Sequence, residues 1–246
     1  QESTIDPSDL LPESDTTLAT GIPENKIPDY SVDGFNYVST QGGVKNWKLE
    51  ANQAHLYTEE KITHARVVKT FIYGTDGKIT VVTSREAKYF TNDRDLEMFG
   101  NVKATMPDGF VIESEFLRYE ANRARLNVPT TYAVHGYGKT GNPAAAPSLT
   151  PTSPASPPPN EIDFQSKGMN YDMKNGVIQL PAMVKVTALS PAKEKTVIES
   201  DRCTVLRNEQ SALFRMYPNR PIPKRFVYIT QPSQLTRGRS ADFFYG

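Results

Sequence analysis

The sequence predicts an all-β protein in which antiparallel strands form stacked repeats. Apolar and polar residues alternate over short runs, which is the period of a strand with one buried face. No long segment carries a 3.6-residue apolar stripe, so amphipathic helices are not expected. Turn signals divide the runs about every ten residues, with pairs that accept the positive φ of tight hairpins, namely Gly42-Gly43, Asp76-Gly77, Asp108-Gly109 and Asn175-Gly176.

A repeated motif carries most of the architectural information. It has an apolar residue, Ser two positions later, a small or apolar residue three further, and Tyr two further. The steps of two keep side chains on one face, whereas the step of three breaks this parity and requires a bulge or corner, where a small Ser is tolerated. Three full copies start at Val82, Ile112 and Phe164, and looser copies start at Leu49, Ile198 and Thr236.

These repeats predict units of two or three strands, each about 5 to 8 residues long. One such unit cannot bury its own apolar face, so we expect the units to stack. Small side chains such as Ala51, Ser84 and Ala87 alternate with large ones such as Trp47 and Tyr89 at inward positions. This mixture fits either a groove with room for a guest or a sealed sandwich whose side chains interlock.

Composition divides the chain of 246 residues, which has 28 basic and 28 acidic side chains. Residues 1–28 are acidic and turn-rich, which predicts a disordered lead-in. Residues 143–159 contain seven prolines, typical of an extended linker or insertion. We therefore expect a β-body over 29–142 and a second part over 160–246, which either continues that body or forms a second section.

The residue pattern offers no catalytic or metal-binding chemistry, so no cofactor is expected and the protein is not predicted to be an enzyme. The three histidines, His55, His64 and His135, lie outside known ligand spacings. Cys203 is expected to be a small buried side chain. The chain has no nucleophile elbow, no phosphate-binding glycine loop and no run of the ~20 apolar residues that a membrane helix needs.

Several motifs in register resemble the LptC family of periplasmic lipopolysaccharide-export proteins. The later copies of the repeat are similar to the wider organic-solvent-tolerance family, which includes LptA-like proteins. The resemblance covers 28–136 well and 160–246 more loosely. The residues that carry it are Pro28-Asp29-Tyr30, Trp47-Lys48-Leu49-Glu50-Ala51-Asn52-Gln53-Ala54, Ser84-x-x-Ala87-x-Tyr89 and Leu96-x-x-x-Gly100-Asn101-Val102.

The resemblance implies an open, twisted antiparallel β-jellyroll, in one or two sections, that carries lipid A acyl chains inside. It further implies a periplasmic protein, tethered to the inner membrane by an upstream helix, that contacts exporter subunits and an LptA-like jellyroll protein through edge strands. The final run, 240–245, is a candidate edge. The interior positions implied to bind lipid are Trp47, Leu49, Ala54, Leu56, Val82, Ala87, Tyr89, Leu96, Val102, Phe110, Ile112, Leu117, Tyr119, Phe164, Met169, Tyr171 and Ile198.

Two alternatives remain open at this level. An adhesin-like β-sandwich would have a sealed core and would bind no acyl chain. A parallel β-helix enzyme acting on polysaccharide would also show repeats, but with shorter rungs than the 30 to 38 residues of this repeat. Cation-rich stretches at 193–195, 215–225 and 237–239 fit solvated loops, or contacts to lipid phosphates.

Overall fold

The computed structural model of the protein describes residues 26–74, 77–139, 161–218 and 226–244. The described residues form sixteen strands in one sheet, together with two short 3-10 turns, η2 (Ala121–Arg123) and η3 (Arg207–Glu209). The strands are β1 Tyr30–Gln41, β2 Val44–Tyr57, β3 Ile62–Tyr73, β4 Ile79–Phe90, β5 Asp95–Thr105, β6 Val111–Glu120, β7 Arg125–Lys139, β8 Glu161–Asp172, β9 Val177–Leu180, β10 Ala182–Leu189, β11 Lys195–Ser200, β12 Arg202–Leu206, β13 Ser211–Arg215, β14 Val227–Gln231, β15 Gln234–Gly238 and β16 Ser240–Phe244.

The sheet folds into two facing layers. Strands β1 to β8 pair in sequence order, and beyond β8 the sheet divides, because the first half of β8 pairs with β10 and its last residues pair with β9. One branch continues through β11, β14 and β15, and the other through β12, β13 and β16. We call the layer with β10, β11, β14 and β15 the first layer and the layer with β9, β12, β13 and β16 the second layer.

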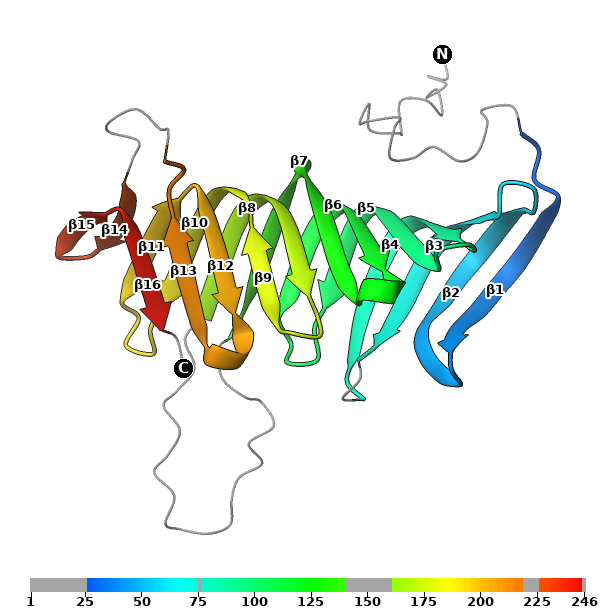
Figure 1. Cartoon of the computed structure of the whole chain (residues 1–246), viewed down its shortest axis with the longest axis horizontal. Helices are drawn as coiled ribbons and strands as arrows, with labels where there is room; N and C mark the ends of the chain where they lie inside the picture. Colours follow the sequence, from blue (N-terminus) through cyan, green and yellow to red (C-terminus); the bar gives the residue numbers. More distant parts are fainter. Residues whose placement is uncertain (1–25, 75–76, 140–160, 219–225, 245–246) are drawn as a thin grey trace, which may run out of the picture.

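Figure 1 shows these strands following one another along the long axis, from β1 at one end to β15 and β16 at the other. Every strand pair is antiparallel, including β7 with β8 and β10 with β11. The predicted all-β, antiparallel jellyroll with an open side is therefore confirmed. The parallel β-helix alternative is wrong, because its rungs would pair in parallel.

The long strands pass from one layer to the other through a single bend. In β4, Ser84 faces inward, the next two residues, Arg85 and Glu86, both point away from the core, and Ala87 faces inward again. This is the step of three in the repeat, and the β4–β5 register shifts between Thr83 and Glu86. All six copies of the motif lie where the chain crosses from the first layer to the second, in β2, β4, β6, β8, β11–β12 and β15–β16.

Strand lengths differ from the predicted 5 to 8 residues, because β2 to β8 each continue through the bend and reach 10 to 15 residues. A bulge redirects a strand without ending it, since backbone pairing resumes on the far side. Beyond β8 the strands do break at the corner, so that β9 and β10, for example, are separate strands on either side of Pro181.

Serine at the bend has a defined hydrogen-bonding role. The hydroxyl groups of Ser84, Ser166 and Ser200 each donate to the backbone carbonyl two residues ahead, at 2.9, 3.0 and 3.1 Å. Ser114 instead donates to the carbonyl of Ala133 in the neighbouring β7, at 2.8 Å. A carbonyl turned out of the ladder by the bend thus keeps a partner, as buried backbone groups require.

Glycine is required at one of these bends for two reasons. Gly168 in β8 has a φ of +76°, and a Cβ built there would lie 3.0 Å from the Cα of Thr130 in β7. Gly34 in β1 lies at the same level of the sheet with a φ of +66°, but its Cβ would meet nothing within 4 Å. Comparing Gly168 with Gly34 therefore separates the effect of backbone strain at positive φ from the effect of close approach to a neighbouring strand.

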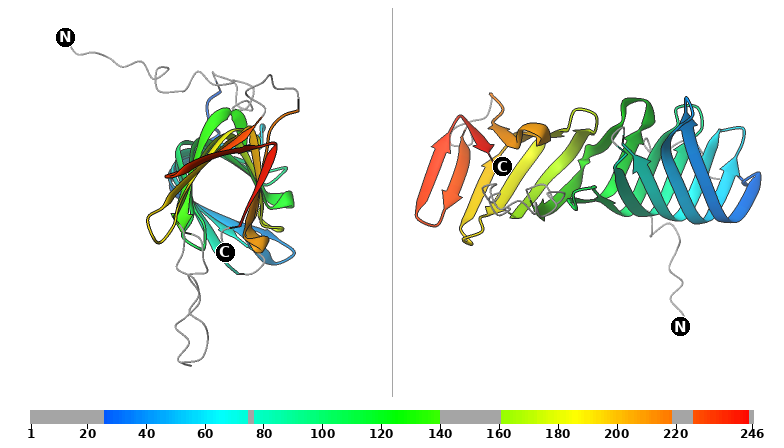
Figure 2. Two further views of the ribbon diagram at one scale, coloured as in Figure 1. Left: turned by 90° about the vertical axis from the view of Figure 1, so that its left-hand side faces the viewer. Right: turned by 90° about the horizontal axis from the view of Figure 1, so that it is seen from below.

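The core lies between the two layers, which Figure 2 shows facing each other when viewed along the long axis. The bends close one long side of this body. The hairpin turns of both layers lie along the opposite side, which we call the open side. Among the described residues, no backbone hydrogen bond joins a turn of the first layer to a turn of the second.

The described residues limit what can be said of the expected domains. Most of the acidic lead-in and the whole proline-rich segment lie outside them. On either side of that segment, β7 and β8 pair from Arg125–Asp172 to Lys139–Glu161, so the sheet is continuous from the first expected part into the second.

We predict that Gly168→Ala destabilises the protein more than Gly34→Ala. Both changes add the strain of an L-residue at positive φ, about 1–2 kcal/mol, but only the first also forces β7 and β8 apart. The free energy of unfolding, measured by urea titration, should fall further for Gly168→Ala. Equal losses in the two variants would show that close packing at this bend contributes nothing.

Candidate functional site

The apolar interior is the first candidate site, and the structure places all seventeen predicted lining residues there. Fifteen are buried members of the main core cluster, among them Trp47, Tyr89 and Phe164. Leu56 and Phe110 are half-buried and pack against that cluster. That these positions contact a lipid remains a prediction.

The lining side chains fill the interior near β1. The rings of Tyr37, Trp47 and Tyr89 meet with centroid separations of 4.9 to 5.5 Å. Tyr37 and Trp47 belong to the first layer and Tyr89 to the second, so this group spans the core. A hydrocarbon guest would therefore have to displace side chains or part the two layers.

Several interior residues were missed by the sequence analysis. Leu126, Leu180 and Phe214 are at most 1% exposed members of the core cluster, and Tyr37, on β1, is partly buried against the same cluster. Their signal was the period-two pattern of short runs outside the repeat motif, such as Val177–Leu180. Return strands carry no Ser or Tyr marker, so the motif did not identify them.

The free sheet edges are the second candidate site. Among the described strands, β1 pairs only with β2, β15 only with β14, and β16 only with β13. Exposed apolar side chains lie on these strands, including Tyr30 and Val32 on β1, Leu235 on β15 and Phe244 on β16. Unpaired backbone groups beside exposed apolar side chains can accept a strand from another chain. The expected edge at 240–245 is β16 as far as Phe244.

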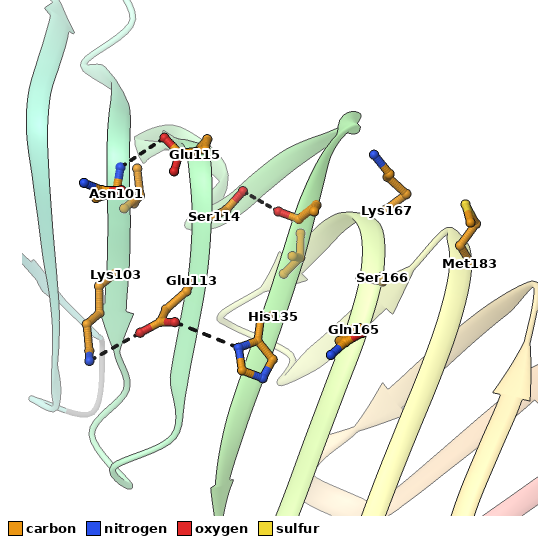
Figure 3. Close-up of a pocket in the computed structure, with 13 residues that line it drawn as sticks. Asn101, Lys103, Glu113, Ser114, Glu115, His135, Gln165, Ser166, Lys167 and Met183 are labelled. Carbon is orange, nitrogen blue, oxygen red and sulfur yellow. Dashed lines mark hydrogen bonds and ion pairs between the residues drawn. The ribbon is translucent and has the colours of Figure 1, made fainter. Parts of the chain in front are cut away.

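A shallow groove on the outer face is the third candidate (Figure 3). It has a volume of about 810 Å³ and crosses β5, β6, β7, β8 and β10. His135 lies in it with Nε2 2.6 Å from Asp163 Oδ2, and with Nδ1 3.9 Å from Glu113 Oε2. Tyr137 donates to Glu113 at 3.0 Å, and Lys103 lies 3.4 Å from the same carboxylate.

These groove side chains satisfy one another across the sheet, as cross-strand charge pairs do. The two serine hydroxyls that line the groove, Ser114 and Ser166, donate to backbone carbonyls rather than to a histidine. The arrangement therefore stabilises the outer face and places no nucleophile beside a base.

A charged cluster is buried on the outer face of the second layer. The Arg118 guanidinium donates to Asp95 at 2.8 Å and to Glu97 at 3.3 Å. Glu97 is only 2% exposed, and its desolvation raises its pKa to about 7 despite the opposing charges of Arg118 and Lys88. Burial also lowers the pKa of Lys88. The backbone N–H of Ala121 donates to Asp95, which fixes η2 against β5.

We predict a pH dependence of stability that arises from Glu97. Its pKa of about 7 in the folded state exceeds the ~4.3 of an unfolded Glu. The folded state therefore binds the extra proton between these values, and the free energy of unfolding falls as the pH rises from about 4.5 to about 7, by about 1–3 kcal/mol.

Replacing Glu97 by Gln should flatten this slope, as measured by urea unfolding at pH 5 and pH 8. Glu199→Gln is the matched control, since Glu199 forms an exposed pair with Lys185 at 3.4 Å, and it should leave the slope unchanged. A Glu97→Gln variant with the parent slope would contradict the assignment.

Two further observations bear on the kind of protein this is. In the part of the chain that the structure describes, no helix has the length and apolar character needed to cross a bilayer. Within the same residues, no group of His, Cys, Asp and Glu side chains is arranged to hold a metal ion.

Comparison with known proteins identifies the family. A search of the curated proteins finds no match. A family profile described as lipopolysaccharide-assembly, LptC-related matches residues 10–142. The match covers more than half of the 246 residues, and its described part comprises β1 to β7, whereas β8 to β16 lie beyond it. With its two-layered antiparallel sheet and apolar interior, the chain belongs to the LptC-related family, a family of periplasm-facing transport proteins with a role in lipopolysaccharide assembly.

Proposed function

We propose that this protein binds the acyl chains of lipopolysaccharide between its two layers and transfers them from an inner-membrane exporter to the next jellyroll carrier. The observation that supports this most directly is the open side. The layers are continuous through the bends, but within the described ranges their turns share no backbone hydrogen bonds. They can therefore part on one side without breaking the sheet.

Energetics favour such a mechanism. Each buried methylene contributes about 0.8 kcal/mol, so a fourteen-carbon chain contributes on the order of 10 kcal/mol before ordering costs. This gross gain is set against the packing lost when the layers separate. Because the interior side chains already pack against one another, the net gain is smaller than this gross figure, which favours the release that a carrier needs.

Composition of the lining also suits a guest of this kind. Ala54, Ala87 and Ala104 are buried small residues beside large rings and leucines. Met98 and Met169 lie in the same core, and unbranched methionine side chains adapt readily to a new neighbour. A lining of this type can repack around a hydrocarbon chain.

We predict that a photo-crosslinking amino acid placed inward captures lipopolysaccharide, and one placed outward does not. Phe164 and Ile112 are the inward sites, because both are buried and point into the core. Gln165 and Lys103, on strands β8 and β5, are exposed outward controls. The measurement is adduct formation with purified lipopolysaccharide, detected by gel shift.

Adducts only at the outward sites would contradict the carrier. They would instead favour the adhesin-like sandwich, whose sealed core admits no acyl chain. Lys88 is unsuitable as an outward control because it is itself buried, at 8% exposure.

The free edges are proposed to make the contacts for transfer. β15 and β16 end the two layers together at one end of the sheet, and β1 ends both layers at the other. A neighbouring jellyroll could add its own strands to either end and so extend both layers and the interior between them. We propose that the β15–β16 end meets the next carrier and that the β1 end faces the exporter.

We predict that a photo-crosslinker at Leu235 of β15 captures an LptA-like jellyroll protein in a Gram-negative host. Leu235 is 66% exposed on β15, an edge strand whose one partner among the described strands is β14. Val197 lies on β11 with paired strands on both sides, so the same substitution there should give no adduct. Capture of equal strength at both positions would rule out pairing through this edge.

A further inference from the structure

Side chains tie the layers together across the open side at two described places. Near β1, the Trp47 indole of the first layer donates to the carbonyl of Arg94, in the β4–β5 turn of the second, at 3.2 Å. At the same place, the hydroxyls of Tyr37 in the first layer and Tyr89 in the second lie 3.1 Å apart. The second tie is an ion pair between Arg207 of η3 and Asp108. Asp108 lies in the β5–β6 turn of the first layer, and η3 connects β12 and β13 of the second.

The Arg207 guanidinium is held ready for this contact by its own layer. The backbone N–H of Arg207 donates to the carbonyl of Gly176 at 2.9 Å, and the side-chain amide of Asn208 donates to the carbonyl of Asn175 at 3.1 Å. These bonds fasten η3 to the β8–β9 turn. The guanidinium itself donates to the Tyr171 hydroxyl at 3.2 Å and lies 5.8 Å from the centre of that ring.

Asp108 is likewise held in place by hydrogen bonds within its own turn. Its Oδ1 accepts the N–H of Phe110 at 3.1 Å, and the N–H of Gly109 donates to the carbonyl of Met106 at 2.9 Å. Its other oxygen, Oδ2, faces Arg207. The two side chains remain about a quarter exposed, at 25% and 29%, so water and solutes reach the pair.

The Arg207–Asp108 ion pair lies across the path that a headgroup would take along the open side. Asp108 belongs to the part of the chain that matches the family profile, and Arg207 lies beyond that part. An amphiphile with its tails between the layers must keep its polar headgroup outside, and the open side is where the layers are not bonded by backbone. A headgroup moving from the β1–β7 part into the β8–β16 part therefore meets the closed ion pair.

We infer that Arg207 and Asp108 form a latch that an anionic headgroup opens by exchange. A phosphate bonded to the Arg207 guanidinium replaces the Asp108 carboxylate, because guanidinium binds phosphate through the same paired N–H groups. A neutral headgroup offers nothing in exchange and must break the pair without compensation. Arg207 thus makes the carrier selective for phosphate-bearing amphiphiles. This inference rests on the proposed function, since it requires tails between the layers.

The test compares two single-chain probes, dodecyl phosphate and dodecyl maltoside, by titration calorimetry below their micelle concentrations. The parent should bind dodecyl phosphate more tightly than the maltoside. Asp108→Asn removes the competing carboxylate and should widen this preference, by on the order of tenfold, whereas Arg207→Gln should abolish it. Melting temperatures of all variants check that each is folded.

A matched control is the double variant Arg215→Gln, Asp242→Asn. Arg215 and Asp242 lie 3.4 Å apart on β13 and β16, which are neighbours within the second layer. Removing this exposed pair deletes the same kinds of charge without touching the open side, and it should leave the preference unchanged.

A direct readout on the parent protein is the side-chain NMR signal of Arg207, assigned by its loss in Arg207→Lys. Dodecyl phosphate should shift this signal, and dodecyl maltoside should not. If both probes bind and neither variant alters the preference, the latch is wrong while the carrier stands. If neither probe binds the parent, the carrier itself fails, and the latch with it.

Discussion

The bend that every long strand makes at the same level of the sheet is the constraint on which the rest of this structure depends. A sheet that folds back on itself must turn all of its strands along one line, and each turned backbone must keep its hydrogen-bond partners. Here two successive outward residues make the turn, the serine hydroxyls of Ser84, Ser166 and Ser200 satisfy displaced carbonyls, and glycine at position 168 permits close approach of β7. The two layers, the interior and the open side all follow from this line.

The open side and the core oppose each other energetically. Core side chains such as Trp47 and Phe214 are fully buried, and their packing favours closed layers. The absence of backbone hydrogen bonds between the turns of the described residues lowers the cost of parting them. Side-chain contacts hold the layers together there. They are the hydrogen bond from the Trp47 indole to the Arg94 carbonyl, the Tyr37 and Tyr89 hydroxyls 3.1 Å apart, and the Arg207–Asp108 ion pair. Contacts of this kind can exchange with a ligand, whereas a β-ladder cannot do so without local unfolding.

Charges are distributed differently on the two outer faces. The first layer carries cross-strand pairs that remain partly solvated, such as Lys185 with Glu199. The second layer buries Glu97 and Lys88. Desolvation raises the pKa of Glu97 and lowers the pKa of Lys88, so burial favours the neutral form of each. Buried charge of this kind costs stability unless its partners are well placed. Arg118, held between Asp95 and Glu97, is the side chain that makes this cluster tolerable.

The sequence by itself determined the strand class, the repeat and the inward positions, because side-chain alternation and the step of three are local properties that any sheet must express on one face or the other. It also carried the resemblance to the LptC family through short motifs such as Trp47 to Ala54. Only the tertiary structure decided that the strands continue through the bend, that the second part of the chain extends the same sheet, and that Arg207 meets Asp108. Those outcomes depend on pairing between residues far apart in the chain, such as Lys139 with Glu161 and β5–β6 with η3. Local pattern does not encode them, since many partners would satisfy the same backbone groups equally well.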